Sequence, residues 1–83
     1  MKVLYFAWIR ERVGKAQEEI SFPPEVKTVA DAIAWLTEKD ETYGHAFGDL
    51  RVVRAAIDQS MVALDAPIAG AREVAFFPPV TGG

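Results

Sequence analysis

Residues 73–77 read EVAFF, an almost unbroken apolar run between Gly70 and Pro78. Its length and its valine and phenylalanine content predict a β-strand, and its apolar character predicts that both faces of the strand are covered. A second run of this kind, VLYFAWI at residues 3–9, predicts the first strand of the chain. Since strands covered on both faces lie inside a sheet, we expect these two strands to lie side by side at its centre.

Shorter strands are predicted around these two runs. Gly14 supplies a turn, and the alternation at residues 19–22 (EISF) predicts a half-exposed strand that forms a hairpin with the first one. Residues 52–57 and residues 61–64 predict two further strands, which the turn at residues 58–60 separates. The last strand of the chain is then the run EVAFF.

One helix is predicted between the strands. Thr28 is placed as its N-cap, and Asp31, three residues later, completes a capping box. Val29, Ile33 and Leu36 fall on one stripe of the helix. That apolar stripe must pack against one face of the sheet.

The chain is too short to supply a second covering layer. The predicted order of elements is β-β-α-β-β-β, with a glycine-containing loop at residues 40–49 (DETYGHAFGD). Within 83 residues nothing remains to cover the sheet face opposite the helix. An exposed apolar face of this kind usually marks an interaction with a partner.

Composition restricts the kind of site that the chain can carry. The formal net charge is −3, and an acidic domain without a cluster of lysine and arginine argues against nucleic acid as a partner. The lack of cysteine excludes disulfides, thiolate zinc sites and iron–sulfur clusters, and fits a reducing compartment. The apolar runs are far shorter than the roughly 20 residues that cross a membrane. We therefore expect one cytoplasmic domain with no membrane partner.

The side chains do not predict a catalytic or metal centre. His45 is the only histidine and is interpreted as a surface residue. Glu38, Asp40 and Glu41 are interpreted as a solvated helix end rather than as a metal site. No base accompanies the serines and threonines, so a nucleophilic triad is not predicted.

The end of the sequence is unusual for a compact domain. Residues 78–83 read PPVTGG, and a pair of glycines contributes no side chain to a core. We expect a folded domain at residues 1–77 and an extended, flexible tail at residues 78–83. Such a tail reaches about 20 Å, since an extended residue spans roughly 3.3–3.6 Å. The pattern alone leaves open whether the tail is inert or whether the function requires a thin, flexible end.

The final stretch EVAFFPPVTGG, at residues 73–83, closely resembles the C-terminus of the small subunits of molybdopterin synthase, a family of ubiquitin-like sulfur carriers. Residues 3–7 (VLYFA), with Arg10 and Glu11, are similar to the first strand of that family and the turn after it. The resemblance implies an α+β fold of the β-grasp, ubiquitin-like class. In this fold the first and last strands are parallel at the centre of a mixed sheet, and one main helix packs on one face.

The resemblance also implies a role for the tail. A separate activating enzyme uses ATP to adenylate Gly83, and a sulfur donor protein converts the adenylate to a thiocarboxylate. The tail then enters the active site of the synthase large subunit, where the sulfur passes to cyclic pyranopterin monophosphate and forms the dithiolene of molybdopterin. The inserted residues are Pro78, Pro79, Val80, Thr81, Gly82 and Gly83. No cofactor binds to this chain itself, and the ATP belongs to the activating enzyme.

The assembly that the resemblance implies is a heterotetramer of two large and two small subunits. The catalytic side chains belong to the large subunit, so this chain is expected to be a sulfur-donating subunit. Candidate interface residues are Phe6, Arg10, Phe76 and Phe77. Aromatic side chains anchor interfaces, although they also fill cores. Arg10 is included because it matches the Arg-Glu pair of the family.

Three alternatives remain open from the sequence. The first is a sulfur carrier of the same fold that feeds thiazole or cysteine synthesis. The second is a ubiquitin-like protein modifier, in which Gly83 is joined to lysines of target proteins. The third is an interaction module whose tail is inert.

Overall fold

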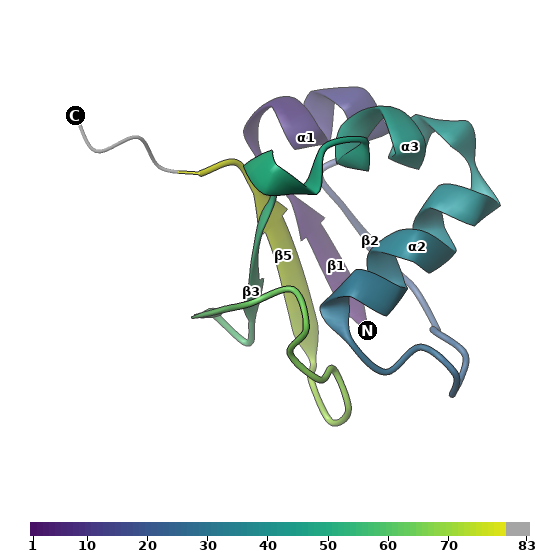
Figure 1. The fold of residues 1–83 in the computed structure, drawn as a ribbon, viewed down its shortest axis with the longest axis vertical. Helices are drawn as coiled ribbons and strands as arrows, with labels where there is room; N and C mark the ends of the chain where they lie inside the picture. Colours follow the sequence, from purple (N-terminus) through teal and green to yellow (C-terminus); the bar gives the residue numbers. More distant parts are fainter. Residues whose placement is uncertain (80–83) are drawn as a thin grey trace.

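The structure is a computed structural model and describes residues 1–79. These residues form both helices and strands, and Figure 1 shows the helices gathered on one side of the strands. The elements are β1 (Lys2–Tyr5), α1 (Ala7–Val13), β2 (Gln17–Glu19), α2 (Val29–Lys39), α3 (Glu41–Phe47), the 3₁₀ turn η1 (Leu50–Val52), β3 (Arg54–Ile57), β4 (Ser60–Val62) and β5 (Glu73–Phe77).

The strands form one mixed sheet in the order β2-β1-β5-β3-β4. The first and last strands lie side by side in parallel, with Val3 opposite Val74 and Tyr5 opposite Phe76. The other neighbouring strands are antiparallel. The predicted central pair is therefore confirmed, and the architecture is the α+β β-grasp fold.

The prediction of one strand over residues 3–9 is wrong beyond Tyr5. Phe6 is still extended, but Ala7 has φ of 53°, which turns the chain out of the sheet and into α1. In α1, Ile9 and Val13 are four residues apart and both are buried, as a helix face requires. A short apolar run cannot be assigned to strand or helix by its periodicity, and here one run supplies both.

The second strand lies earlier than predicted. β2 covers Gln17–Glu19 rather than residues 19–22, and α1 stands between it and β1, so the two strands do not form a tight hairpin. The apolar residues after β2 pack on the core instead: Ile20 is buried, and Phe22 lies edge-on to Trp35 at a centroid distance of 5.3 Å. The predicted turn at Gly14 is confirmed, since Gly14 has φ of 89° and ends α1.

The helix predicted from Thr28 is confirmed as α2. The backbone N–H of Asp31 donates to Oγ1 of Thr28 at 3.1 Å, and the N–H of Thr28 donates to Oδ2 of Asp31 at 3.2 Å. These two bonds form the predicted capping box. Val29, Ile33 and Leu36 are buried, so the predicted apolar stripe faces the core.

The predicted loop at residues 40–49 contains α3. Asp40 is its N-cap and accepts a hydrogen bond from the N–H of Thr42 at 2.9 Å. The buried residues Tyr43, Ala46 and Phe47 have helical spacing, a pattern that the two glycines of the segment obscured.

The strands after α3 begin and end within two residues of their predicted positions. β3 starts at Arg54 because Leu50–Val52 form η1. Asp58 and Gln59 both have positive φ and join β3 to β4 in a two-residue hairpin turn. The boundaries of β5 agree with the prediction, since its run is bounded by Gly70 and Pro78.

Alternate residues of the central strands face two different environments. One face carries Val3, Tyr5, Val74 and Phe76, which form the core together with the buried residues of the three helices. Two of these helices, α1 and α3, were not predicted, and both add buried side chains to the core.

The opposite sheet face, here called the open face, carries no helix within residues 1–79 (Figure 1). One row of side chains crosses it, because Leu4 pairs with Ala75, Ala75 with Ala56, and Ala56 with Met61. Met61 is 70% exposed, and Leu4 and Phe77 are half-buried. The predicted uncovered apolar face is therefore present.

Candidate functional site at the end of the last strand

The last strand is held between two neighbours up to its final residue. Tyr5 of β1 lies opposite Phe76, and Arg54 of β3 lies opposite Phe77. The N–H of Phe6 also donates to the carbonyl oxygen of Phe76 at 3.1 Å. Any segment that follows Phe77 therefore starts from a fixed point of the sheet.

Phe76 anchors this point in the core. Its side chain has no exposed area, its ring stacks on that of Tyr5 with centroids 6.2 Å apart, and the ring of Phe47 meets it edge-on at 5.0 Å. Phe76 thus belongs to the core and does not lie on a surface that a partner can reach. Among the four candidate interface residues, it is the one that the fold removes from the surface.

The other three candidates are accessible. Phe6 is 46% exposed, Arg10 is exposed on α1, and Phe77 is half-buried. Because Phe6 is extended and follows Leu4 by two residues, it continues the open face past the end of β1. An interface role for Phe6, Arg10 and Phe77 stays a prediction.

The expected tail begins with half-buried residues and no regular secondary structure. Pro78 and Pro79 leave the sheet directly after β5 (Figure 1). The predicted site residues Val80, Thr81, Gly82 and Gly83 lie outside the described residues, as does most of the proposed tail.

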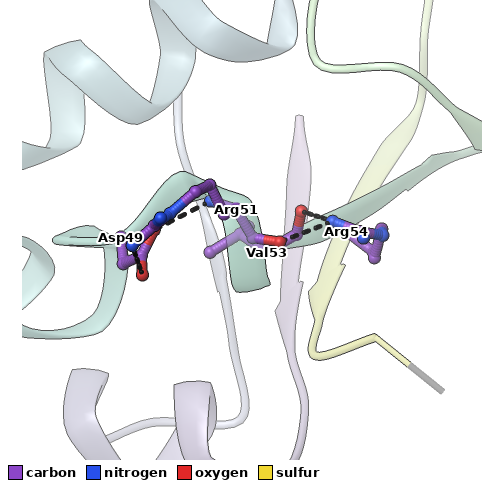
Figure 2. Close-up of polar contacts among 4 residues, drawn as sticks. All are labelled: Asp49, Arg51, Val53 and Arg54. Carbon is purple, nitrogen blue, oxygen red and sulfur yellow. Dashed lines mark hydrogen bonds and ion pairs between the residues drawn. The ribbon is translucent and has the colours of Figure 1, made fainter. Parts of the chain in front are cut away.

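Sequence reasoning missed a polar group beside the start of the tail. Figure 2 shows Asp49, Arg51, Val53 and Arg54 lined up along η1 and the start of β3. Asp49 holds Arg51 through two bonds, Nε to Oδ1 at 2.9 Å and Nη2 to Oδ2 at 3.0 Å. Nη1 of Arg54 donates to the carbonyl oxygens of Arg51 and Val53, each at 3.1 Å. The available signal was an arginine inside the apolar pattern VVRAAI.

A partly buried group of hydrogen bonds around Glu18 connects β1, β2 and α3. Oε2 of Glu18 accepts from the hydroxyls of Tyr5 at 2.7 Å and Tyr43 at 2.6 Å, and Oε1 pairs with Nζ of Lys15 at 3.2 Å. Burial alone raises the pKa of Glu18, but the hydrogen bonds from Tyr43, Tyr5 and Lys15 outweigh it and hold that pKa below its usual value. Burial, together with the bond to Glu18, raises the pKa of Tyr5, so this hydroxyl stays a proton donor.

Within residues 1–79, no group of three or more His, Asp or Glu side chains is placed to hold a metal ion. His45 lies exposed in the last turn of α3. None of the helices in this part of the chain has the length and apolar character to cross a membrane.

Comparison with known proteins agrees with this geometry. The model of the ThiS family matches residues 3–83. The molybdopterin synthase sulfur carrier subunit of Escherichia coli is 37% identical over 83 residues, which cover 100% of this chain and 99% of that protein.

Two solved structures share the fold over nearly the whole chain. The putative molybdopterin converting factor, subunit 1, of Pyrococcus furiosus has a TM-score of 0.72 at 31% identity and covers 95% of each chain. SAMP1 from Haloferax volcanii has a TM-score of 0.74 at 27% identity and covers 100% of this chain and 98% of its own. The chain therefore belongs to the ThiS family of β-grasp proteins, as one of its molybdopterin synthase sulfur carrier subunits.

Proposed function

We propose that Gly83 carries sulfur as a thiocarboxylate and delivers it to cyclic pyranopterin monophosphate inside the large subunit of molybdopterin synthase. The observation that supports this most is the clamped end of β5. The core and the two neighbouring strands hold β5 in place up to Phe77, and the sequence PPVTGG follows directly. A fixed base and a slender end are what insertion into another protein requires.

The residue types suit the chemistry. A terminal carboxylate is ionised at neutral pH, and its carbon is a poor electrophile because oxide is a poor leaving group. Attack of the carboxylate oxygen on the α-phosphate of ATP releases pyrophosphate and leaves an acyl adenylate. Sulfide-level sulfur from a donor protein then attacks the carbonyl carbon of the adenylate, the bond from that carbon to the phosphate oxygen breaks, and AMP leaves. The resulting thiocarboxylate is the nucleophile for the pterin, and water returns the oxygen to Gly83 after the sulfur has been transferred.

The glycines and prolines set the shape of the delivery arm. Gly82 and Gly83 have no Cβ, so the tip is no wider than a backbone and the carbonyl of Gly83 is open to attack. Pro78 and Pro79 favour the extended polyproline conformation, which reduces the entropy lost on insertion. We propose that two large and two small subunits assemble, with catalytic side chains on the large subunit.

Intact mass spectrometry tests the charging step. The chain is incubated with ATP, the activating enzyme and a sulfur donor, and we expect a mass gain of one sulfur-for-oxygen exchange. Deletion of Gly83 abolishes this gain without changing the thermal unfolding curve. A deletion variant that still yields thiocarboxylate, or a wild-type chain that never does, contradicts the proposal.

A second function is supported by the structural likeness to SAMP1, the small archaeal modifier protein 1 of Haloferax volcanii. In this case Gly83 forms an amide with lysines of target proteins. The two functions differ in product: conjugation gives species of higher mass on a denaturing gel, whereas sulfur transfer returns the chain to its original mass.

A further inference from the structure

Three of the four large exposed apolar side chains of the described residues lie near the end of the sheet where β5 ends. Phe6 follows β1, Leu50 and Val52 belong to η1, and Met61 lies on β4; they are 46%, 40%, 40% and 70% exposed. Phe6 is hydrogen-bonded to the residue before Phe77, and η1 leads directly into β3, which pairs with β5. Phe6 and the η1 residues therefore lie on either side of the place where the tail starts, and Met61 lies further back on the open face, opposite Ala56.

Two arginines, Arg51 and Arg54, lie beside these apolar side chains, and of the two only Arg51 forms an ion pair within residues 1–79. Arg54 is opposite Phe77 in the β3–β5 pair, and two residues along β3, Ala56 is opposite Ala75 on the open face. Because residues two apart share a face, Arg54 belongs to the open face, at its corner beside the start of the tail.

Two backbone carbonyls of preceding residues hold the guanidinium of Arg54, and no carboxylate within residues 1–79 pairs with its charge. Its Nη1 donates to the carbonyl oxygens of Arg51 and Val53 (Figure 2). None of the ion pairs within residues 1–79 includes Arg54. An arginine has five N–H donors, so those on Nε and Nη2 remain for another molecule. The neighbouring Arg51 differs, since the carboxylate of Asp49 already holds it.

A partner that covers this surface must supply a group that pairs with the charge of Arg54. When a partner buries Phe77, Val52 and their neighbours, it also removes water from Arg54. An unpaired charge in that position opposes binding, whereas a carboxylate meets the planar fork of a guanidinium with two parallel hydrogen bonds. A phosphate on the substrate is a poorer match, because an extended tail places the reacting end about 20 Å from Arg54.

We propose that Arg54 is a specificity-determining residue of the docking surface, and that the large subunit carries an aspartate or glutamate opposite it, at the rim of the opening that receives the tail. This inference rests on the proposed function, because it takes the synthase large subunit as the partner. The carboxylate of the large subunit lowers the affinity for carriers that have no cation at this position. Arg54 in turn lowers the affinity for partners that have no acidic residue opposite it.

Binding of the full-length chain to purified large subunit tests the proposal, with the dissociation constant measured by calorimetry at several salt concentrations. Arg54→Gln is expected to weaken binding by about tenfold and Arg54→Glu by about a hundredfold. The difference between wild type and Arg54→Gln shrinks as salt rises, because ions screen the charge. Arg51→Gln is the matched control, and we expect its affinity to stay within about twofold of wild type because Asp49 already occupies that side chain.

The outcomes separate the inference from the proposed function. If wild type binds and Arg54→Glu binds equally well, or Arg51→Gln is as weak as Arg54→Gln, the inference is wrong and the proposed function stands. If wild type forms no complex, both are wrong. Thermal unfolding of each variant shows whether it folds, and Arg54→Gln, which introduces no like charge, decides the matter if Arg54→Glu is unstable.

Discussion

Phe76 and Phe77 are neighbours in β5, yet their side chains lie on opposite faces of the sheet. Phe76 has no exposed area and contacts the rings of Tyr5 and Phe47, whereas Phe77 is half-buried on the open face. Because successive side chains of a strand point to opposite faces, one of these residues stabilises the core and its neighbour lies on the accessible face. Phe76 holds the end of β5 in the core, and Phe77 is available to a partner.

Substitution of these two residues is expected to separate stability from binding. Phe76→Ala removes a fully buried ring and lowers the free energy of unfolding by about 3–5 kcal/mol. Phe77→Ala lowers it by about 1 kcal/mol, because less area is buried, but weakens binding to the large subunit by tenfold or more, as aromatic anchors do. Urea denaturation and calorimetry measure the two effects. Equal losses of stability in the two variants contradict this division of tasks.

The Glu18 group is expected to make stability depend on pH. Although burial opposes it, the bonds from Tyr43 and Tyr5 lower the folded-state pKa of Glu18. The carboxylate therefore stabilises the fold above the unfolded-state pKa of about 4.3, and this contribution is lost as the pH falls through the folded-state pKa. Glu18→Gln costs about 1–3 kcal/mol at pH 7, from the loss of hydrogen bonds to a charged group.

Urea denaturation of wild type and Glu18→Gln from pH 7 to pH 3 measures this contribution. The two free energies of unfolding converge as the pH falls, because protonation of Glu18 removes the same charge as the substitution. A gap that stays constant over this range shows that the charge of Glu18 does not stabilise the fold.

Two glycines are expected to respond to alanine in opposite directions. Gly14 has φ of 89°, so Gly14→Ala costs about 1–2 kcal/mol although the added Cβ meets nothing within 4 Å. Gly44 lies inside α3, and an added Cβ contacts Cγ2 of Thr37 at an ordinary 3.5 Å. Gly44→Ala therefore raises the free energy of unfolding by about 0.5–1 kcal/mol. Thermal unfolding compares the variants, and a gain from Gly14→Ala contradicts the left-handed cap.

The sequence predicted elements whose ends carry a local signal, such as a glycine, a proline or a capping box. β5 has Gly70 and Pro78 on either side of its run, and α2 has the Thr28–Asp31 capping box. The central pairing of the first and last strands followed from their apolar character, and the parallel direction from the family resemblance.

The elements that the sequence did not predict are α1 and α3. α1 shares one apolar run with β1, and only the left-handed backbone at Ala7 separates them. α3 contains Gly44 in its interior, so a helix looked like a loop. Arg54 could not be placed at the candidate site from the sequence, because only the register of the sheet shows that it lies opposite Phe77. The chemistry assigned to Gly83 came from family resemblance and stays a proposal.

A single-turnover transfer experiment tests the central claim most directly. Thiocarboxylated chain is mixed with large subunit and cyclic pyranopterin monophosphate, and the intact mass of the chain is followed with time. We expect the mass to fall by one oxygen-for-sulfur exchange as the pterin gains the sulfur, and no fall without the large subunit. A chain that keeps its sulfur in the complete mixture, or that becomes joined to other proteins instead, contradicts the account.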